Sequence, residues 1–373
     1  MHTQNLELSG MDVYGSDPLA RFLIGRWKIW PIGLAFFIFL WSLFFLFLLP
    51  AVFGFLFPST DIVRNSLADY YNQINFLIIF PTVAYYYLAQ PQIVIRIYNI
   101  VLRYVHDSDR ASSLSSYVRE QHAKNYWVVP GILFALLGMG LGAYDNVTQK
   151  LGIYWYAANW FMIFLMQLTR GLVFYILFTV AIRHLVASTC LNKIFQRTES
   201  LIILTSTKQN TIYHAINNYA FSFSSIVAVA GLSLGLQPIL SNPPYPEYYI
   251  FVAVYFVLAP VSFFLPIWQL HKEMTSSRSK ILDNLNAKLQ AEFKEFVDSF
   301  DEKAVTSAKK SEAISMRLKL IREAIELAEK SPKWPFDVNT IYKLGVTVIS
   351  PFLITIINRI VELGVQLLDS IID

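Results

Sequence analysis

Long apolar segments separated by short polar ones dominate the chain up to about residue 270. The first runs from Ile29 to Thr60 without a charged side chain, and from Pro31 to Phe57 nearly every position is apolar or aromatic. A helix needs about 20 apolar residues to cross a hydrocarbon core of about 30 Å. Five further segments meet this requirement, so the pattern predicts an all-α, polytopic membrane protein with six transmembrane helices at about 31–57, 70–92, 126–144, 155–182, 220–240 and 247–269.

The composition agrees with a lipid environment. Hydrophobic residues make up 55% of the chain and charged residues only 15%, against about 25% charged residues in ordinary soluble domains. The first apolar segment is too long for a cleavable signal peptide, so we expect the first span to remain in the mature protein. The single cysteine, Cys190, excludes an internal disulfide framework.

Basic residues alternate between the connecting segments, and this alternation orients the predicted helices. On the opposite side of the membrane, the only basic residues in the three loops are Arg64 and Lys150. By the positive-inside rule, we expect a protein of the cell membrane whose two termini both face the cytoplasm. The basic residues on the cytoplasmic side are Arg21, Arg26, Lys28, Arg96, Arg103, Arg110, Arg119, Lys124, Arg183, Lys193, Arg197, Lys208, Lys272, Arg278 and Lys280.

The composition changes abruptly after residue 270, which separates a transmembrane domain (1–270) from a polar tail. Apolar residues recur at three- and four-residue steps from Leu282 to Phe300, and again from Ile314 to Ala328, among lysines and glutamates. Each stripe predicts an amphipathic helix with a seam like that of a coiled coil. Residues 271–332 are therefore predicted to form a cytoplasmic helical coil, either a hairpin or one bent rod, packed within one chain or between chains.

A proline-rich break precedes the last segment, residues 333–373. Trp334 and Phe336, in the sequence SPKWPFD, suit insertion at a membrane surface. The uncharged stretch 344–358 is shorter than a span and contains Pro351, so we expect an interfacial or re-entrant C-terminal helix with an amphipathic, largely apolar character. Its heptad-like residues suit self-association, burial against the same chain or membrane-surface docking, and they are Ile349, Leu353, Ile356, Ile360, Leu363 and Leu367.

Arg170 is the most distinctive polar residue, because it lies near the middle of the fourth predicted span. Gln167 precedes it by one turn, Asn159 lies further along nearly the same face, and Asn75 of the second span is a candidate partner. A central arginine costs roughly 2.5 to 3.5 kcal/mol on insertion scales, so it should face protein or water. We expect it either to hold spans together by hydrogen bonds or to line an aqueous or anion path.

Small residues in the spans predict close helix contacts. The glycines whose spacing allows this approach are Gly138, Gly142, Gly231 and Gly235. The five residues from Gly231 to Gly235 also match the GxSxG nucleophile motif, but that motif requires a strand-to-helix turn and a histidine partner. Here the GxSxG match lies inside a predicted apolar helix. A separate glycosylation sequon at Asn146 lies close to the membrane, and we interpret it as a chance match.

Phosphate-binding, dinucleotide-binding and paired metal-ligand motifs are absent from the sequence. We therefore expect no enzyme activity, no cofactor and no nucleic-acid partner. No carboxylate falls deep within a predicted span, which disfavours proton or cation coupling.

Three functions remain open at this level. The leading hypothesis is a homo-oligomeric, channel-like pore, selective for anions or only weakly selective, whose cytoplasmic helices assemble or gate it. The second is a non-conducting membrane scaffold or sensor that docks a soluble cytoplasmic protein through residues 271–332. The third is a small-solute carrier, although the spans lack the matched broken helices of an inverted repeat.

Overall fold

The computed structural model describes residues 8–58, 65–103, 105, 107–151, 153–197, 207–240, 246–298, 307–330, 334, 341–343, 345–353, 355–357 and 360. These residues are overwhelmingly helical and contain no β-strand. Six helices within these ranges are long and apolar enough to cross a membrane, in the order that the apolar segments predict. The chain therefore fits a multi-pass membrane protein.

The first two spans are helices interrupted by wide π-helical turns. Their elements, in order, are α3 (Pro31–Leu43), η2 (Phe44–Leu48) and α4 (Leu49–Val52), then α5 (Tyr70–Ile74), η4 (Asn75–Ile79) and α6 (Phe80–Arg103). The two π turns lie shortly before Pro50 and Pro81, which lack the amide donor that would continue the helix. The hydroxyl of Ser42 donates to the carbonyl oxygen of Phe76 at 2.7 Å, so a side chain of the first span partly replaces the donor missing at Pro81.

Each of the other four spans contains one α-helix of at least 18 residues. They are α8 (Val128–Asp145), α9 (Trp160–Arg197), α10 (Thr207–Leu240) and α11 (Pro246–Phe264). Helix α9 has 38 residues and α10 has 34, so both extend beyond the predicted spans. The shorter elements are α1 (Gly10–Tyr14), α2 (Pro18–Ala20), η1 (Arg21–Arg26), η3 (Ser66–Ala68), α7 (Ser108–Ala123), η5 (Asn146–Lys150), η6 (Trp155–Ala157) and η8 (Leu265–Ile267).

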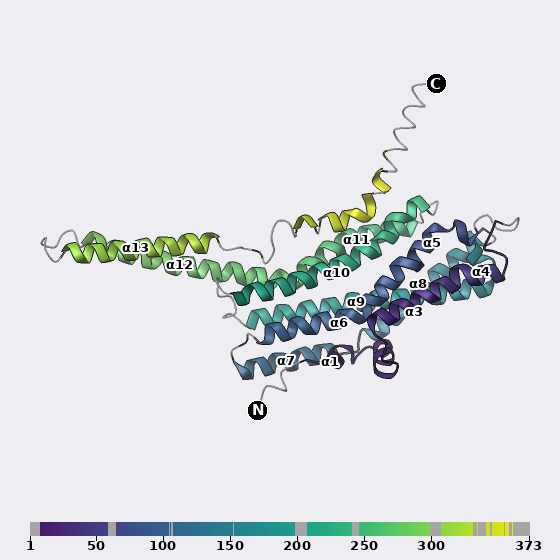
Figure 1. The fold of residues 1–373 in the computed structure, drawn as a ribbon, viewed down its shortest axis with the longest axis horizontal. Coiled ribbons are helices and arrows are strands. Elements are labelled where there is room, and N and C mark those ends of the chain that lie inside the picture. Colours follow the sequence, from purple (N-terminus) through teal and green to yellow (C-terminus); the bar gives the residue numbers. More distant parts are fainter. Residues whose placement is uncertain are drawn as a thin grey trace, which may run out of the picture.

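The long helices lie side by side in an elongated bundle (Figure 1). Helix α6 contacts α3, α9 and α10, while α8 packs on the other side of α9 and α11 packs on α10. Large apolar side chains remain exposed on the outer helices, for example Phe36 at 59% on α3 and Leu133 at 60% on α8. Such surfaces are expected where a bundle faces hydrocarbon.

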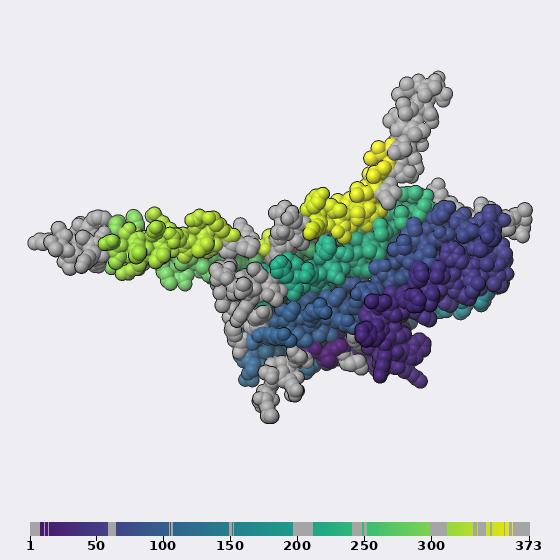
Figure 2. Space-filling view, viewed as in Figure 1, coloured from purple at the N-terminus to yellow at the C-terminus, as the bar shows by residue number. Residues whose placement is uncertain are grey.

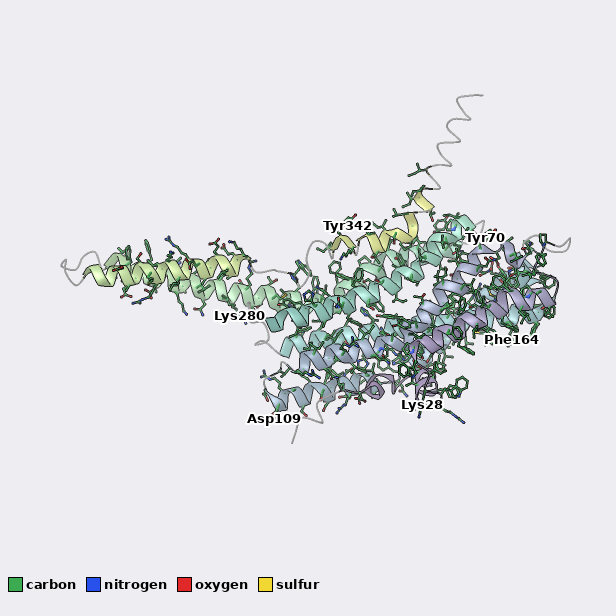
Figure 3. The ribbon with its side chains drawn as sticks, in the orientation of Figure 1. Lys28, Tyr70, Asp109, Phe164, Lys280 and Tyr342 are labelled. Atoms are coloured by element: carbon green, nitrogen blue, oxygen red, sulfur yellow. The ribbon has the colours of Figure 1, made fainter. Side chains whose placement is uncertain are left out.

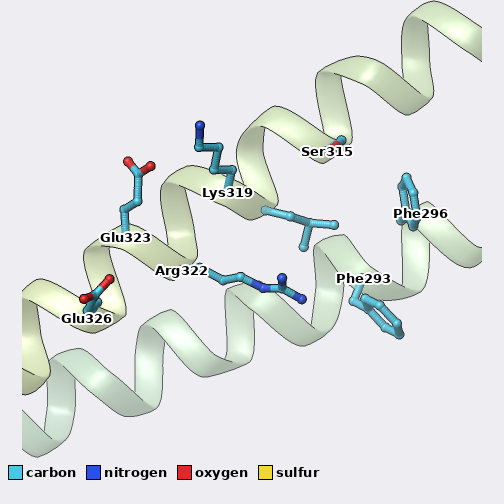
Figure 4. Close-up of a pocket in the computed structure, with 8 residues that line it drawn as sticks. Phe293, Phe296, Ser315, Lys319, Arg322, Glu323 and Glu326 are labelled. Atoms are coloured by element: carbon cyan, nitrogen blue, oxygen red, sulfur yellow. The ribbon is translucent and has the colours of Figure 1, made fainter.

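Two further helices form an antiparallel hairpin that projects from one end of the bundle, the hairpin end (Figure 1). Helix α12 (Trp268–Asp298) follows the sixth span directly, and α13 (Ser307–Lys330) folds back along it. Arg278 on α12 donates from Nε to the carbonyl oxygen of Ala328 at 3.0 Å, while Ile314 and Leu318 on α13 are buried. The two predicted stripes therefore meet within one chain. A groove between the helices is lined by Phe293, Arg322 and their neighbours (Figure 4).

The bundle end opposite the hairpin, here called the far end, carries Tyr70 and Phe164, whereas Asp109 lies toward the hairpin end (Figure 3). Helix α9 runs from the far end to the hairpin end, and α8 runs in the opposite direction. This antiparallel arrangement sets which residues of α8 and α9 meet.

The C-terminal segment packs against its own chain. The ring of Trp334 stacks on His271 with a centroid distance of 3.5 Å, so this tryptophan of the predicted membrane-surface motif contacts α12. The helix that begins at Ile341 then lies over α10 and α11 (Figure 2). Tyr255 donates its hydroxyl to the carbonyl oxygen of Val348 at 3.3 Å, and the rings of Phe256 and Phe352 lie 4.9 Å apart.

Candidate functional site in the membrane interior

The polar pair that the sequence predicts within the fourth span lies where α8 crosses α9. Arg170 and Gln167 are one turn apart on α9, and both side chains reach the backbone of Gly142 on α8. A Cβ atom at Gly142 would lie 1.6 Å from Arg170 Nη1 and 2.4 Å from Gln167 Oε1. Any side chain at this position would displace the guanidinium, so the glycine is required here for close approach.

Neither side chain is fully paired by the protein. Gln167 is only 4% exposed, yet neither atom of its side-chain amide has a hydrogen-bond partner among the described residues. Arg170 is partly buried and forms no ion pair with any residue that the structure describes. Buried polar groups are normally hydrogen-bonded, so a buried amide without a protein partner beside a guanidinium is unusual.

Asn75 lies apart from this pair, and both Asn75 and Arg170 interact with Tyr71. Its side-chain Nδ2 donates to the carbonyl oxygen of Tyr71 at 2.8 Å, and the Tyr71 hydroxyl lies 3.0 Å from Ser233 Oγ on α10. Arg170 is close enough to interact with the Tyr71 hydroxyl through its charge. The second, fourth and fifth spans therefore contribute polar groups to the same region of the bundle.

Asn159 does not join this region. Its side chain accepts a hydrogen bond from the backbone N–H of Met162 at 2.9 Å, and its carbonyl oxygen accepts from Ile163 at 3.1 Å. These are the contacts of a helix N-cap at the start of α9. The span begins at Trp160, so Asn159 lies at its end and Arg170 about 15 Å along it.

A buried ion pair that the sequence did not reveal joins the N-terminal segment to α9. Asp17 and Arg183 are 0% and 4% exposed, and Arg183 Nη2 donates to Asp17 Oδ2. The same carboxylate accepts from the hydroxyl of Tyr87 at 2.5 Å and from that of Tyr175 at 3.0 Å. Arg183 also lies over the Tyr87 ring, 4.7 Å from its centroid.

This pair changes the interpretation of Arg183, which the charge pattern treats as an exposed cytoplasmic residue. It is buried and neutralised in the bundle, so it contributes nothing to a basic surface. A local signal does exist at Asp17, because aspartate followed by proline is a typical helix start. The Asp17 side chain accordingly accepts from the backbone N–H of Leu19 at 3.0 Å. Nothing in the local pattern identifies a partner 166 residues away.

His184, the residue after Arg183, is also buried. Its ring stacks on Phe223 of α10 with a centroid distance of 3.6 Å, and its Nε2 lies 2.7 Å from the carbonyl oxygen of Ser262 on α11. A carbonyl oxygen can only accept, so Nε2 carries the proton in this arrangement. His184 therefore connects three helices and has a packing role.

The remaining predicted glycines lie at close contacts between different elements. Gly138 faces the ring of Phe174 on α9, where an added Cβ would lie 2.4 Å from the nearest atom. Gly231 faces Tyr255 on α11 at the same distance, and Gly235 faces the carbonyl oxygen of Pro351 at 1.7 Å. The GxxxG pair therefore contacts two elements, α11 and the C-terminal helix.

The predicted assembly residues lie on the outer face of the C-terminal helix where the structure describes them. Ile349, Leu353, Ile356 and Ile360 are between 43% and 63% exposed. Leu363 and Leu367 lie outside the described residues. No group of three or more histidine, cysteine or acidic residues suited to a metal ion occurs within the described ranges. Comparisons with protein-family models, curated proteins and solved structures give no match to this chain.

Proposed function

We propose that this protein is a non-enzymatic membrane protein that assembles as a homo-oligomer and forms a pore for anions, or a weakly selective one. The observation that carries the proposal is Arg170, which lies inside a membrane span without a charged partner among the described residues. A purely structural arginine in hydrocarbon should be paired, because an uncompensated charge there is costly. Water or a mobile anion can supply the missing contact.

Two carboxylates near the spans support the proposed preference for anions. Asp17 is occupied by Arg183 and two tyrosines, and Asp69 accepts from Trp155 Nε1 at 3.0 Å and from Asn72 Nδ2 at 2.8 Å. Carboxylates held in this way are poorly placed to bind a passing cation. A cation-selective pore commonly needs free carboxylates within the field.

Self-association is proposed to use the outer face of the C-terminal helix. That helix is fixed to α10 and α11 on one side and presents Ile349, Leu353 and Ile356 on the other. A second copy of the chain would bury this face. Particle images of the purified protein that show rotational symmetry and a water-filled central axis would support the pore. A compact monomer would contradict it.

Conductance of the reconstituted protein provides the functional test. We expect Arg170→Leu to lower anion conductance by roughly 10- to 100-fold, since a charge-assisted contact of about 1.5 to 3 kcal/mol is lost. Planar bilayers under a potassium chloride gradient measure both conductance and selectivity. The matched control is Arg26→Leu, at an exposed arginine, which should conduct normally. Strong cation selectivity of the unaltered protein would contradict the proposal.

The orientation proposed from the basic residues is tested by labelling. Arg110 is 59% exposed on α7, and the native Cys190 is buried, so Arg110→Cys gives a single accessible thiol. We expect a membrane-impermeant maleimide to label it in opened or inverted vesicles and to leave intact cells unlabelled. Labelling from outside intact cells would place the hairpin end outside and reverse the proposed orientation.

A scaffold function is favoured by one specific observation on the α12–α13 hairpin. Met316, Leu320 and Leu327 on α13 are 59% to 69% exposed, although the buried residues of the same helix already face α12. A second apolar stripe of this kind suits a protein partner. Deleting residues 271–373 separates the two functions, because a scaffold loses its partner while a pore loses assembly or gating.

A further inference from the structure

Besides Arg170 and Gln167, a third polar side chain, that of Asn146, is buried at the junction of α8 and α9. Asn146 is fully buried, and within the described part of the chain neither atom of its side-chain amide has a hydrogen-bond partner. Its backbone N–H donates to the carbonyl oxygen of Gly142, so the helix continues regularly from Gly142 to Asn146. Residues four apart lie on the same helix face, and Asn146 therefore follows Gly142 along the face that meets α9.

This burial also bears on the sequon at Asn146. A glycan acceptor must be accessible, whereas the Asn146 side chain is 0% exposed and Thr148 donates its hydroxyl to the carbonyl oxygen of Tyr144 at 2.7 Å. The amide of Asn146 thus faces the protein interior. Two buried amides, each with one donor group and one acceptor atom, adjoin the same helix junction as a guanidinium.

Arg170 brings a positive charge to this junction and forms no ion pair with the residues that the structure describes. Asp145 lies on the same turn as Gly142 and interacts with another group of the chain. The guanidinium and the two amides can together donate several hydrogen bonds. Both amides are buried, so a bulky phospholipid headgroup is poorly placed to reach them.

We infer that a small monovalent inorganic anion such as chloride binds between α8 and α9, held by Arg170, Gln167 and Asn146. The inference rests on the proposed anion pore for its biological meaning, since it names the permeant class and the place where it binds. The Arg170 guanidinium supplies charge-assisted hydrogen bonds, and the amide N–H groups complete the shell. The absence of a side chain at Gly142 provides the space for the guanidinium.

Thermal unfolding of the full-length protein in detergent tests the site. Chloride is titrated against gluconate at constant ionic strength, because gluconate is too large for the buried amides. We expect chloride to raise the apparent unfolding temperature by about 2 to 4 °C as the site saturates. Arg170→Gln should abolish this dependence and Gln167→Leu should weaken it.

Matched variants separate binding from folding defects. Arg26→Gln should keep the full chloride response, because Arg26 is exposed and lies in η1, outside the α8–α9 junction. Gly142→Ala should lose the response by displacing the guanidinium, whereas Gly140→Ala, with no atom within 4 Å of its added Cβ, should retain it. Equal responses of these two glycine variants would count against the site.

Two other outcomes overturn the inference. An unfolding temperature that is the same in chloride and gluconate means that ordered water fills the junction. Stabilisation by nanodiscs of anionic lipid, without any effect of chloride, identifies a lipid phosphate as the occupant. Chloride binding without conductance would support the site and contradict the proposed pore. Conductance without chloride-dependent stability would support the pore and contradict the site.

Discussion

Replacing Arg183 by methionine is expected to destabilise the protein by about 3 to 5 kcal/mol, because it leaves a buried carboxylate without its counter-charge. Asp17 is 0% exposed and is held by Arg183, Tyr87 and Tyr175. Without the guanidinium, only the two tyrosine hydroxyls and the backbone N–H of the cap would remain to stabilise the negative charge of the Asp17 carboxylate. Thermal unfolding in detergent measures the loss, and proteolysis should release the N-terminal segment earlier than in the unaltered protein.

The double variant Asp17→Asn with Arg183→Met is the informative control. Removing both charges costs far less than removing one, so the double variant should be more stable than Arg183→Met alone. Arg26→Met, at an exposed site, should leave the stability within about 0.5 kcal/mol. If Arg183→Met costs under 1 kcal/mol, or if the double variant is the less stable of the two, the buried pair does not hold the N-terminal segment.

The helical spans were predictable from sequence because lipid imposes one requirement on every residue of a segment. An apolar stretch such as 31–57 must satisfy its backbone internally, and a helix does so locally. The two stripes of residues 282–328 were predictable for a similar reason, since their spacing places apolar side chains on one helix face. The choice between hairpin and rod was not, because both bury the same stripes. The structure resolves it through contacts such as that of Arg278 with Ala328.

The candidate site was predictable only in part. Arg170 and Gln167 share a helix face by their spacing, and that relation needs no tertiary information. Their position over Gly142 depends on how α8 and α9 align, and many glycines could have met them. Asn159 illustrates the reverse case, because a shift of a few residues in the helix start turns an apparent interior residue into a cap.

The pair of Asp17 and Arg183 shows a limit of charge patterns. The positive-inside rule counts charges along the chain and cannot tell a solvated arginine from one that is neutralised inside the bundle. That distinction depends on a carboxylate from a distant segment. The orientation proposed above therefore rests on exposed residues such as Arg26 and Arg110, and it gains nothing from Arg183.

Gly235→Ala should release the C-terminal helix from the bundle. An added Cβ would lie 1.7 Å from the carbonyl oxygen of Pro351, and a backbone atom cannot move aside as a flexible side chain can. Thr355 also donates its hydroxyl to the carbonyl oxygen of Gly235, so this contact would be lost with the close approach. We expect a destabilisation of roughly 1 to 3 kcal/mol from the overlap.

Gly140→Ala is the matched control, because it makes the same substitution inside α8 where no atom lies within 4 Å of the added Cβ. That variant should gain about 0.5 to 1 kcal/mol from the better helix propensity of alanine. The two substitutions are therefore expected to have opposite signs. Equal changes in unfolding temperature would show that the contact between Gly235 and Pro351 contributes nothing to stability.

Release of the helix is measured separately by the reactivity of a thiol at its buried face. Val348 is 7% exposed, and the native Cys190 is buried, so Val348→Cys places one protected thiol under the docked helix. Adding Gly235→Ala should raise its alkylation rate in detergent, whereas adding Gly140→Ala should leave the rate unchanged. Because the outer face of this helix is proposed to hold the oligomer together, the same double variant should also shift the particles toward monomers. An undocked helix in an unchanged oligomer would mean that subunits associate through another surface.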